Sequence, residues 1–278
     1  MCERDSNDDI LRGNELSRRQ FGALGLGATL ATMLPSVAAA ADVSESEVEI
    51  KTPDGTCDAH FVHPAKATAA VLVWPDIWGL RPAFRAMGKR LAESGYAVLT
   101  VNPFYRSIKG QPASREDAFK YAGTLNATTH VSDAKAFVAW LDSLKAVDKR
   151  RKIGTTGYCM GGGMALNAAG RFPDRVGAAA SFHGGYIASE APDSPHLLAG
   201  HMTATVYVAG ARDDGSFDDE QFQRLSTALT EAGVDHTLVT YPALHGFAVP
   251  DNPTYDEAAA TRHWEALESL YAAALVDA

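Results

Sequence analysis

Residues 157–161 read Gly-Tyr-Cys-Met-Gly and join a short apolar segment to a glycine-rich segment with helical spacing. This pattern predicts a sharp strand-to-helix turn, with glycine on both sides because bulkier neighbours would clash. Cys159 lies at the tip of that turn. The N–H groups and dipole of the following helix would stabilise both a thiolate and a developing oxyanion. A buried cysteine in a glycine-rich packing corner would also fit these residues, but the flanking strand and helix favour a nucleophile.

The rest of the chain alternates between apolar strands and helical segments. The predicted strands cover residues 70–74, 97–101, 153–157, 176–182, 205–209 and 236–241, and the predicted helices cover residues 82–94, 131–144, 161–170, 218–232 and 255–275. Two alternating segments, 48–51 and 57–62, flank Pro53-Asp54-Gly55 and predict a hairpin. We therefore predict an α/β fold with a mostly parallel sheet, an antiparallel N-terminal hairpin and helices on both faces. Residues 107–129 are the least regular and are predicted to cover the site.

A cysteine nucleophile needs a base, and His245 has the best position for it. It follows the last predicted strand, so its loop opens at the same sheet edge as the turn that carries the cysteine. His183 also follows a strand, and we interpret it as a pocket-lining or structural residue. The acid should lie on the loop after the penultimate strand, where Asp213 and Asp214 are adjacent. We select Asp214 from its spacing to Phe217, with Asp213 as the alternative, and expect it to hold the imidazole tautomer.

The N-terminal segment has the three parts of an export signal. Residues 17–21 read Ser-Arg-Arg-Gln-Phe, an apolar run covers residues 24–34, and a small-residue tract follows at residues 37–41. We predict that residues 1–41 are a twin-arginine export signal, cleaved after Ala40 or Ala41, and that residues 42–278 form a single domain in the periplasm or outside the cell. The apolar run is too short to span a bilayer, so no membrane anchor is expected in the mature form.

The composition argues against nucleic acid as a partner. The formal net charge is −9, and the densest basic stretch, Lys-Arg-Arg-Lys at residues 149–152, is interpreted as a solvated turn before a strand. After the N-terminal segment the cysteines are Cys57 and Cys159. Cys57 lies in an alternating, strand-like stretch and is predicted to be a small buried side chain.

With these residues in place, the chain resembles the dienelactone hydrolase family of α/β-hydrolases over nearly all of residues 47–275. Four segments carry the resemblance: Trp-Pro-Asp-Ile-Trp-Gly at residues 74–79, Gly-Tyr-Cys-Met-Gly-Gly at residues 157–162, the Asp213-Asp214 loop, and His-Gly-Phe at residues 245–247. The resemblance implies the α/β-hydrolase fold and a hydrolase of cyclic or linear esters that needs no metal and no organic cofactor. Its expected partner is a small-molecule ester or lactone.

The resemblance also implies roles for further residues. Asp76 takes the place of a family glutamate that contacts the resting thiol, and it is one methylene shorter. The backbone amides of Ile77 and Met160 are expected to form the oxyanion hole. Arg106 resembles an arginine that binds the substrate carboxylate, but Val249 occupies the position of a second such arginine. Because one of two bidentate anion contacts is missing, we expect a broader or different ester substrate.

The hypothesis that follows is a Cys159–His245–Asp214 triad that cleaves carboxylic ester or lactone bonds through a thioester intermediate. Two alternatives belong to other classes. Cys159 could serve a thiol redox sensor, or the chain could be an inactive binding protein on a hydrolase scaffold. A redox sensor requires neither the histidine nor the aspartate, so the presence of both at hydrolase spacing favours the enzyme. The sequence does not specify the oligomeric state.

Overall fold

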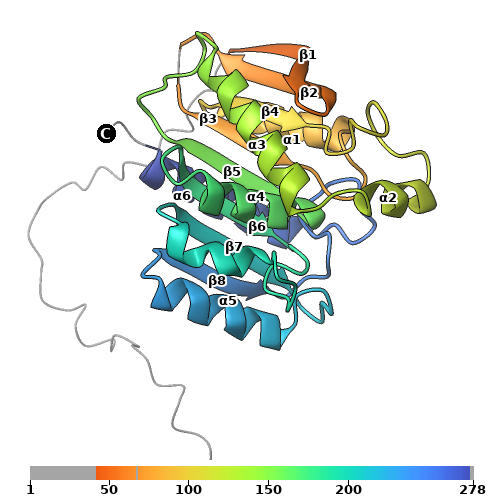
Figure 1. Ribbon diagram of the computed structural model, residues 1–278, viewed down its shortest axis with the longest axis vertical. Helices are drawn as coiled ribbons and strands as arrows, with labels where there is room; N and C mark the ends of the chain where they lie inside the picture. Colours follow the sequence, from red (N-terminus) through yellow and green to blue (C-terminus); the bar gives the residue numbers. More distant parts are fainter. Residues whose placement is uncertain (1–41, 67, 276–278) are drawn as a thin grey trace, which may run out of the picture. The chain divides into compact units, whose positions relative to one another are not determined.

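The computed structural model describes residues 42–66 and 68–275, and within them the chain forms one eight-stranded sheet (Figure 1). In chain order the strands are β1 (Val43–Thr52), β2 (Gly55–Pro64), β3 (Ala70–Trp74), β4 (Ala97–Val101), β5 (Ile153–Tyr158), β6 (Val176–Phe182), β7 (Thr205–Ala211) and β8 (His236–Tyr241). Their order across the sheet is β1-β2-β4-β3-β5-β6-β7-β8. The β1–β2 and β2–β4 pairs are antiparallel and all the other pairs are parallel. The predicted fold class is confirmed.

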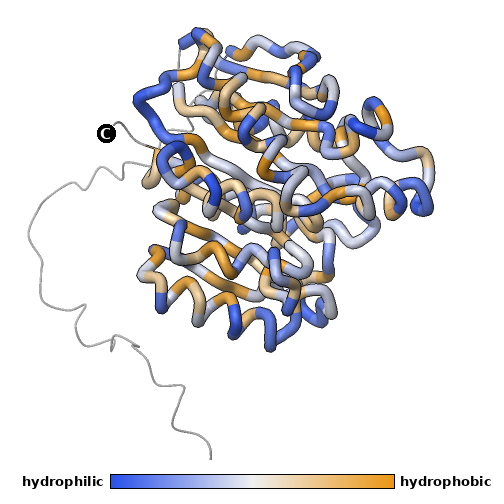
Figure 2. Tube along the Cα trace, in the orientation of Figure 1, coloured by the Kyte–Doolittle hydropathy of each residue, from blue (hydrophilic) through white to orange (hydrophobic). Residues whose placement is uncertain are grey.

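Helices cover both faces of this sheet. The α1 (Pro82–Glu93) and α6 (Glu257–Ala274) helices pack on one face, and α3 (Ala127–Asp142), α4 (Met160–Arg171), α5 (Asp219–Glu231) and the 3-10 helix η1 (Pro195–His201) pack on the other. Side chains of β3 alternate between the layers, with Val71 and Val73 toward α1 and α6, and Leu72 and Trp74 toward α3 and α4. Hydrophilic and hydrophobic stretches alternate along α5 in Figure 2, because only one side of that helix faces the sheet.

The segment at residues 107–129, predicted to be irregular, is more ordered than its pattern indicates. It contains α2 (Arg115–Ala122) and the first turn of α3. A capping box between Asn126 and Thr129 starts α3 at Ala127, earlier than the predicted start at residue 131. This segment does cover the site, because α2 and the start of α3 contribute to the lining of the pocket described below.

The carboxyl ends of the parallel strands meet at one edge of the sheet. The last residues of β7 and β8, Ala211 and Tyr241, are paired with each other, and the end of β5 is paired with the end of β6. The loops that leave this edge carry Cys159, Asp214 and His245. Parallel topology therefore brings together three residues that are far apart in the sequence.

Two predictions concern the chain's relation to membranes. The predicted export signal at residues 1–41 lies outside the described residues. Among the helices that the structure describes, none combines the length and the apolar character needed to cross a membrane.

Candidate active site

Cys159 occupies a strained turn between β5 and α4. Its backbone has φ 53° and ψ −121°, a conformation that side-chain-bearing residues rarely adopt. The flanking glycines are required by close backbone contacts: a Cβ on Gly157 would overlap the carbonyl of Gly161, and a Cβ on Gly161 would overlap the carbonyl of Trp74. The turn holds the cysteine at the pocket surface, where it is one of the lining residues. The geometry is that of the predicted nucleophile turn.

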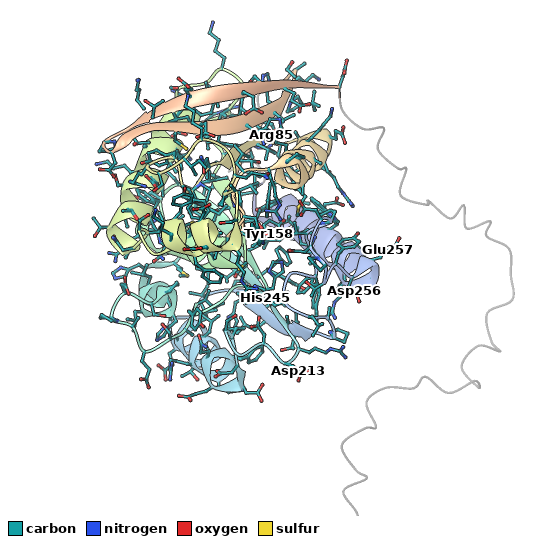
Figure 3. The ribbon with its side chains drawn as sticks, turned by 90° about the vertical axis from the view of Figure 1, so that its right-hand side faces the viewer. Arg85, Tyr158, Asp213, His245, Asp256 and Glu257 are labelled. Atoms are coloured by element: carbon teal, nitrogen blue, oxygen red, sulfur yellow. The ribbon has the colours of Figure 1, made fainter. Side chains whose placement is uncertain are left out.

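His245 lies beside this cysteine and is held by Asp214. The Nδ1 atom of His245 is 2.7 Å from Oδ2 of Asp214, and the Cys159 side chain is a second hydrogen-bond partner of the ring. The other carboxylate oxygen, Oδ1, accepts hydrogen bonds from the backbone N–H (3.0 Å) and hydroxyl (2.6 Å) of Ser216. An ionised carboxylate at Nδ1 fixes the proton there and leaves Nε2 facing the thiol. Asp213 is exposed with φ 54°, and Figure 3 shows it apart from His245, so Asp214 is the aspartate that contacts the histidine.

The electrostatics of the three residues follow from these contacts. Burial by itself would lower the pKa of His245, but the hydrogen bonds with Asp214 and Cys159 outweigh it and raise that pKa to about 10. Burial would raise the pKa of Asp214, but hydrogen bonds from His245 and Ser216 lower it to about 2. Beside an ionised thiol the imidazole therefore keeps both protons at neutral pH, and Asp214 stays ionised.

Two backbone N–H groups are available beside the cysteine. Ile77 and Met160 both line the same pocket as Cys159. Met160 is the first residue of α4, so its N–H has no acceptor within the helix. Ile77 lies in the loop after β3, and its N–H has no hydrogen-bond acceptor among the described residues. These amides are where the family resemblance predicts an oxyanion hole, and that role stays a prediction.

Asp76, predicted to contact the thiol, is instead bound to Arg81. The two guanidinium Nη atoms of Arg81 lie 2.6 and 3.0 Å from the carboxylate oxygens of Asp76, and the backbone N–H of Trp78 donates to the same carboxylate. Within the described chain, Cys159 is not among the hydrogen-bond partners of Asp76. The opposite edge of Arg81 forms two hydrogen bonds, 2.8 and 2.9 Å, with Asp251 on the loop after His245. Arg81 thus links the loop of Ile77 to the loop of His245.

Arg106, predicted to bind the substrate carboxylate, does not line the pocket. Its guanidinium donates two hydrogen bonds to Asp133, at 2.9 and 2.8 Å, and two to Asp54, at 3.2 and 2.6 Å. Tyr105 donates a further hydrogen bond to Asp133. With its charge compensated by two carboxylates outside the pocket, the position of Arg106 does not fit the predicted substrate-binding role.

His183 supports the site from behind and does not line the pocket. Its ring is fully buried, 5.1 Å from the ring of His245 and 5.0 Å from that of Phe247, and its Nδ1 accepts a hydrogen bond of 3.2 Å from the backbone N–H of Cys159. Burial lowers the pKa of His183 well below its usual value, so the ring is neutral. Of the two interpretations given by the sequence, the structural one fits this position.

A pocket of about 700 Å³ opens above Cys159. Few of the residues that line this pocket could be identified from the sequence. They come from α2, α3 and the segment after β6, which are distant in the sequence and meet only in the folded chain. The lining residues beyond Cys159, Asp214 and His245 include Trp78, Phe119, Leu125, Asn126, His130, Gly163, Asn167, Tyr186, Asp193, Ser194 and Pro195. One signal was present in the sequence: Cys159, Gly163 and Asn167 are spaced by four residues and so share a face of α4.

Both cysteines of the described chain are free thiols. Cys57 is fully buried, as predicted, and burial raises its thiol pKa far above the usual value. It is therefore an inert thiol, in contrast to Cys159. Within the described residues, no group of three or more His, Cys, Asp or Glu side chains is arranged to hold a metal ion.

Curated relatives match this chain over most of their own length. A carboxymethylenebutenolidase from Rhodococcus opacus is 27% identical over 225 residues, which cover 77% of this chain and 86% of that relative. Carboxymethylenebutenolidase 1 from Cupriavidus pinatubonensis is 22% identical over 214 residues, which cover 74% of this chain and 87% of that relative.

Solved structures show the same fold. A dienelactone hydrolase-like promiscuous phosphotriesterase from metagenomic libraries superimposes with a TM-score of 0.72 at 23% identity, covering 84% of this chain and 99% of that one. The dienelactone hydrolase from Anabaena variabilis gives a TM-score of 0.63 at 20% identity with the same coverage. A family model described as the dienelactone hydrolase family matches residues 57–275. The chain therefore belongs to the dienelactone hydrolase family and is a hydrolase.

Proposed function

We propose that this hydrolase cleaves carboxylic ester or lactone bonds with Cys159 as nucleophile, His245 as general acid and base, and Asp214 as the residue that orients His245. The observation that carries the proposal is the continuous contact from Asp214 through His245 to Cys159, at a strained turn beside two available amides. A thiol redox sensor or an inactive binding protein would need neither the 2.7 Å contact between Asp214 and His245 nor the placement of His245 at the thiol.

Acylation begins when the proton of the Cys159 thiol passes to His245, whose raised pKa favours the protonated ring. The sulfur of Cys159 attacks the carbonyl carbon, and the electron pair of the C=O bond moves to the oxygen. The amide N–H groups of Ile77 and Met160 donate hydrogen bonds to that oxyanion. When the C–O bond to the leaving group breaks, His245 gives its Nε2 proton to the alcohol, and a thioester remains on the enzyme.

Deacylation reverses these roles. His245, now neutral, takes a proton from water as the water oxygen attacks the thioester carbonyl. The tetrahedral intermediate uses the same two amides, then expels the Cys159 thiolate and releases the acid. The sum is one ester and one water converted to one acid and one alcohol. Asp214 keeps its hydrogen bond to Nδ1 throughout and stabilises the imidazolium without taking its proton.

Two positions favour a neutral substrate over an anionic one. The relatives' names, carboxymethylenebutenolidase and dienelactone hydrolase, support an ester or lactone as the bond that is cleaved. However, Arg106 is occupied by Asp133 and Asp54, and Val249, where a second cation would be expected, is fully buried. A substrate carboxylate would therefore lack the two bidentate contacts that arginines provide.

The test measures turnover of p-nitrophenyl butyrate and a neutral lactone by the purified chain, with and without iodoacetamide. We expect alkylation and the Cys159→Ala change each to abolish turnover. Cys57→Ala is the matched control, because the buried Cys57 thiol is remote from this chemistry and its loss should leave turnover in place. Asp214→Asn should lower kcat about 10³-fold or more by releasing the imidazole tautomer, and Asp213→Asn should not. Undiminished turnover by Cys159→Ala would refute the proposal.

A further inference from the structure

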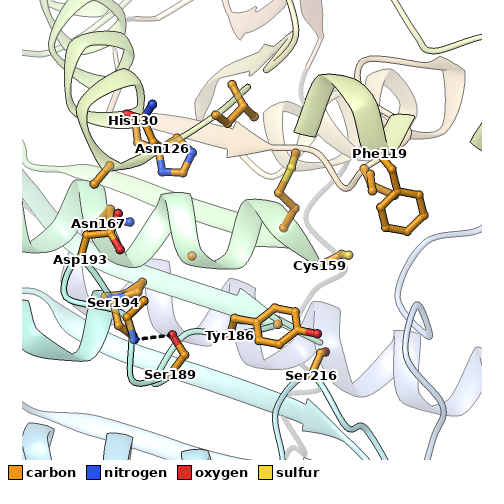
Figure 4. A pocket seen from close by; sticks show the side chains of 18 of the residues that line it. Phe119, Asn126, His130, Cys159, Asn167, Tyr186, Ser189, Asp193, Ser194 and Ser216 are labelled. Carbon is orange, nitrogen blue, oxygen red and sulfur yellow. Dashed lines mark hydrogen bonds between the residues drawn. The ribbon is translucent and has the colours of Figure 1, made fainter. Parts of the chain in front are cut away.

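The pocket above Cys159 extends along one face of α4. Met160, Gly163 and Asn167 of this helix all line it, and their spacing of three and four residues places them on the same face as Cys159. Asn167 follows Cys159 by eight positions, which corresponds to about 12 Å along a helix that rises 1.5 Å per residue. In Figure 4, Cys159 lies toward one end of the pocket, and Asn167 lies toward the other.

Gly163 leaves the middle of this face open. A Cβ on Gly163 would come no closer than 3.7 Å to Pro195 and 3.9 Å to Ile187, which is ordinary contact distance. By contrast, a Cβ on Gly161 or Gly162 would overlap atoms of neighbouring segments. Packing therefore requires glycine at the other two positions but not at Gly163, where the missing side chain gives the pocket room between its two ends.

The two ends differ in character. Phe119 and Tyr186 lie on the side of Cys159 in Figure 4, and both side chains are exposed aromatic surfaces. The other side gathers His130, Asn167 and Asp193. A linear substrate bound in this pocket would therefore extend from the aromatic end beside the Cys159 thiol to the polar end, roughly two turns of α4 away.

Asn167 lacks a hydrogen-bond partner at the polar end. The residue is 6% exposed and lines the pocket, and no hydrogen bond joins its side-chain amide to another described residue. Asparagine is unfavourable within a helix, and this amide gains no hydrogen bond from the described chain in return. Because the residue lines the pocket, a bound group is where its partner would be found.

His130 on α3 also lacks hydrogen-bond partners. Neither of its ring nitrogens has a hydrogen-bond partner in the described part of the chain, although both nitrogens are buried. Burial lowers the pKa of His130 to about 4, so the ring is neutral and offers one donor and one acceptor. The exposed carboxylate of Asp193 acts on His130 in the opposite direction, and the guanidinium of Arg106, which is paired with Asp54 and Asp133, adds to the lowering. The cation of the lining, Arg115, lies over the ring of Phe119, toward the other end.

Resting on the proposed hydrolase function, we propose that Asn167 and His130 form a distal polar subsite that binds a neutral hydroxyl or amide group carried about 12 Å from the scissile carbonyl. The substrate class is then a neutral ester with a long apolar chain and a polar, uncharged terminus. Asp193 would repel a terminal carboxylate at this end, which excludes dicarboxylic half-esters as preferred substrates.

The test compares matched esters that differ only at the terminus. For the acyl side these are p-nitrophenyl ω-hydroxydecanoate and p-nitrophenyl undecanoate, and for the alcohol side ω-hydroxyoctyl butyrate and nonyl butyrate. We expect kcat/KM to favour the hydroxyl member of one pair about tenfold, since two neutral hydrogen bonds would form with groups otherwise unpaired. Asn167→Leu and His130→Leu should each lower this ratio, and the double variant should reduce it to about one. His236→Leu, at the amino end of β8, is the matched control and should retain it.

The outcomes separate the two proposals. Equal kcat/KM within both pairs, with p-nitrophenyl butyrate still hydrolysed, overturns the subsite and leaves the hydrolase function standing. If no ester is hydrolysed, the proposed function fails, and the subsite is decided by binding. Trp78 lines the pocket, so its fluorescence can report binding of methyl ω-hydroxydecanoate and methyl undecanoate to Cys159→Ala. Equal affinity for these two esters overturns the subsite as well.

Discussion

His245 is held between a carboxylate and a thiol, and the proton on its ring depends on both. The hydrogen bonds with Asp214 and Cys159 raise its pKa to about 10 against the opposing effect of burial. A proton that stays on the imidazole at neutral pH leaves the sulfur as the nucleophilic partner of the pair. The reactivity of the Cys159 thiol with and without the His245 imidazole is therefore a direct measure of this contact.

We expect His245→Gln to lower the rate at which iodoacetamide alkylates Cys159 at pH 7 by at least about tenfold, because the glutamine amide cannot take up the thiol proton. The measurement is the alkylation rate by mass spectrometry in the two chains. An equal rate in the variant and in the unaltered chain would contradict the assignment of His245.

At this scale the sequence could be used to predict that Cys159 and His245 lie at the same edge of the sheet, because each follows a recognisable strand. It could not decide between Asp213 and Asp214, because their directions depend on a loop backbone in which Asp213 has φ 54°. It also misplaced Arg106, whose partners Asp54 and Asp133 are distant in the sequence and are brought to it only by the fold.

Among the elements, the loops after β3 and β8 are linked by one buried arginine. Arg81 is 6% exposed and contacts Asp76 on one loop and Asp251 on the other. The loop after β3 carries the Ile77 amide and the loop after β8 carries His245, so this contact restrains the distance between the proposed oxyanion donor and the proposed base. Their relative position matters because catalysis depends strongly on small displacements of the reacting groups.

We expect Arg81→Gln to lower the free energy of unfolding by about 3 kcal/mol, because Asp76 would be left as a buried carboxylate without a counter-ion. The same change should reduce kcat by loosening the two loops. Arg85→Gln, in the first turn of the α1 helix that Arg81 caps, is the matched control, since its pair with Glu47 is solvent-exposed and should contribute less than about 1 kcal/mol. Urea unfolding and ester kinetics check both effects. Equal destabilisation by the two changes would contradict the proposed link.

Element boundaries show where sequence patterns stop being informative. The strands were predicted within a few residues, because apolar β segments bounded by glycine and proline have a strong local signal. Helix α2 was missed because its buried face is a single residue, Ala118, so it lacks an apolar stripe. Its position over the pocket follows from tertiary contacts, and the pocket walls could not be predicted for the same reason.

At the scale of the whole molecule, the parallel topology of the sheet brings the residues of the site together. Six strands from β3 to β8 are joined by parallel pairs, so the loops that carry Cys159, Asp214 and His245 all leave the carboxyl edge. The fold class could be predicted because alternating strands and helices permit few arrangements. The cellular location is a separate question, since it depends on residues 1–41, outside the described part of the chain.

Residues 1–41 are proposed to export the protein by the twin-arginine route. We expect replacement of Arg18 and Arg19 by lysine to keep the full-length chain in the cytoplasm, because the paired arginines form the part of the signal that the export receptor reads. The unaltered chain should appear in the periplasm or medium, shortened by cleavage after Ala40 or Ala41. Arg12→Lys is the matched control, since Arg12 lies in the same segment outside the pair, and this change should leave export intact. Fractionation with mass determination of each N-terminus distinguishes the outcomes. Equal export of the double variant and the unaltered chain would show that the arginine pair is not the export signal. Retention of the unaltered chain in the cytoplasm would place Cys159 in a reducing environment.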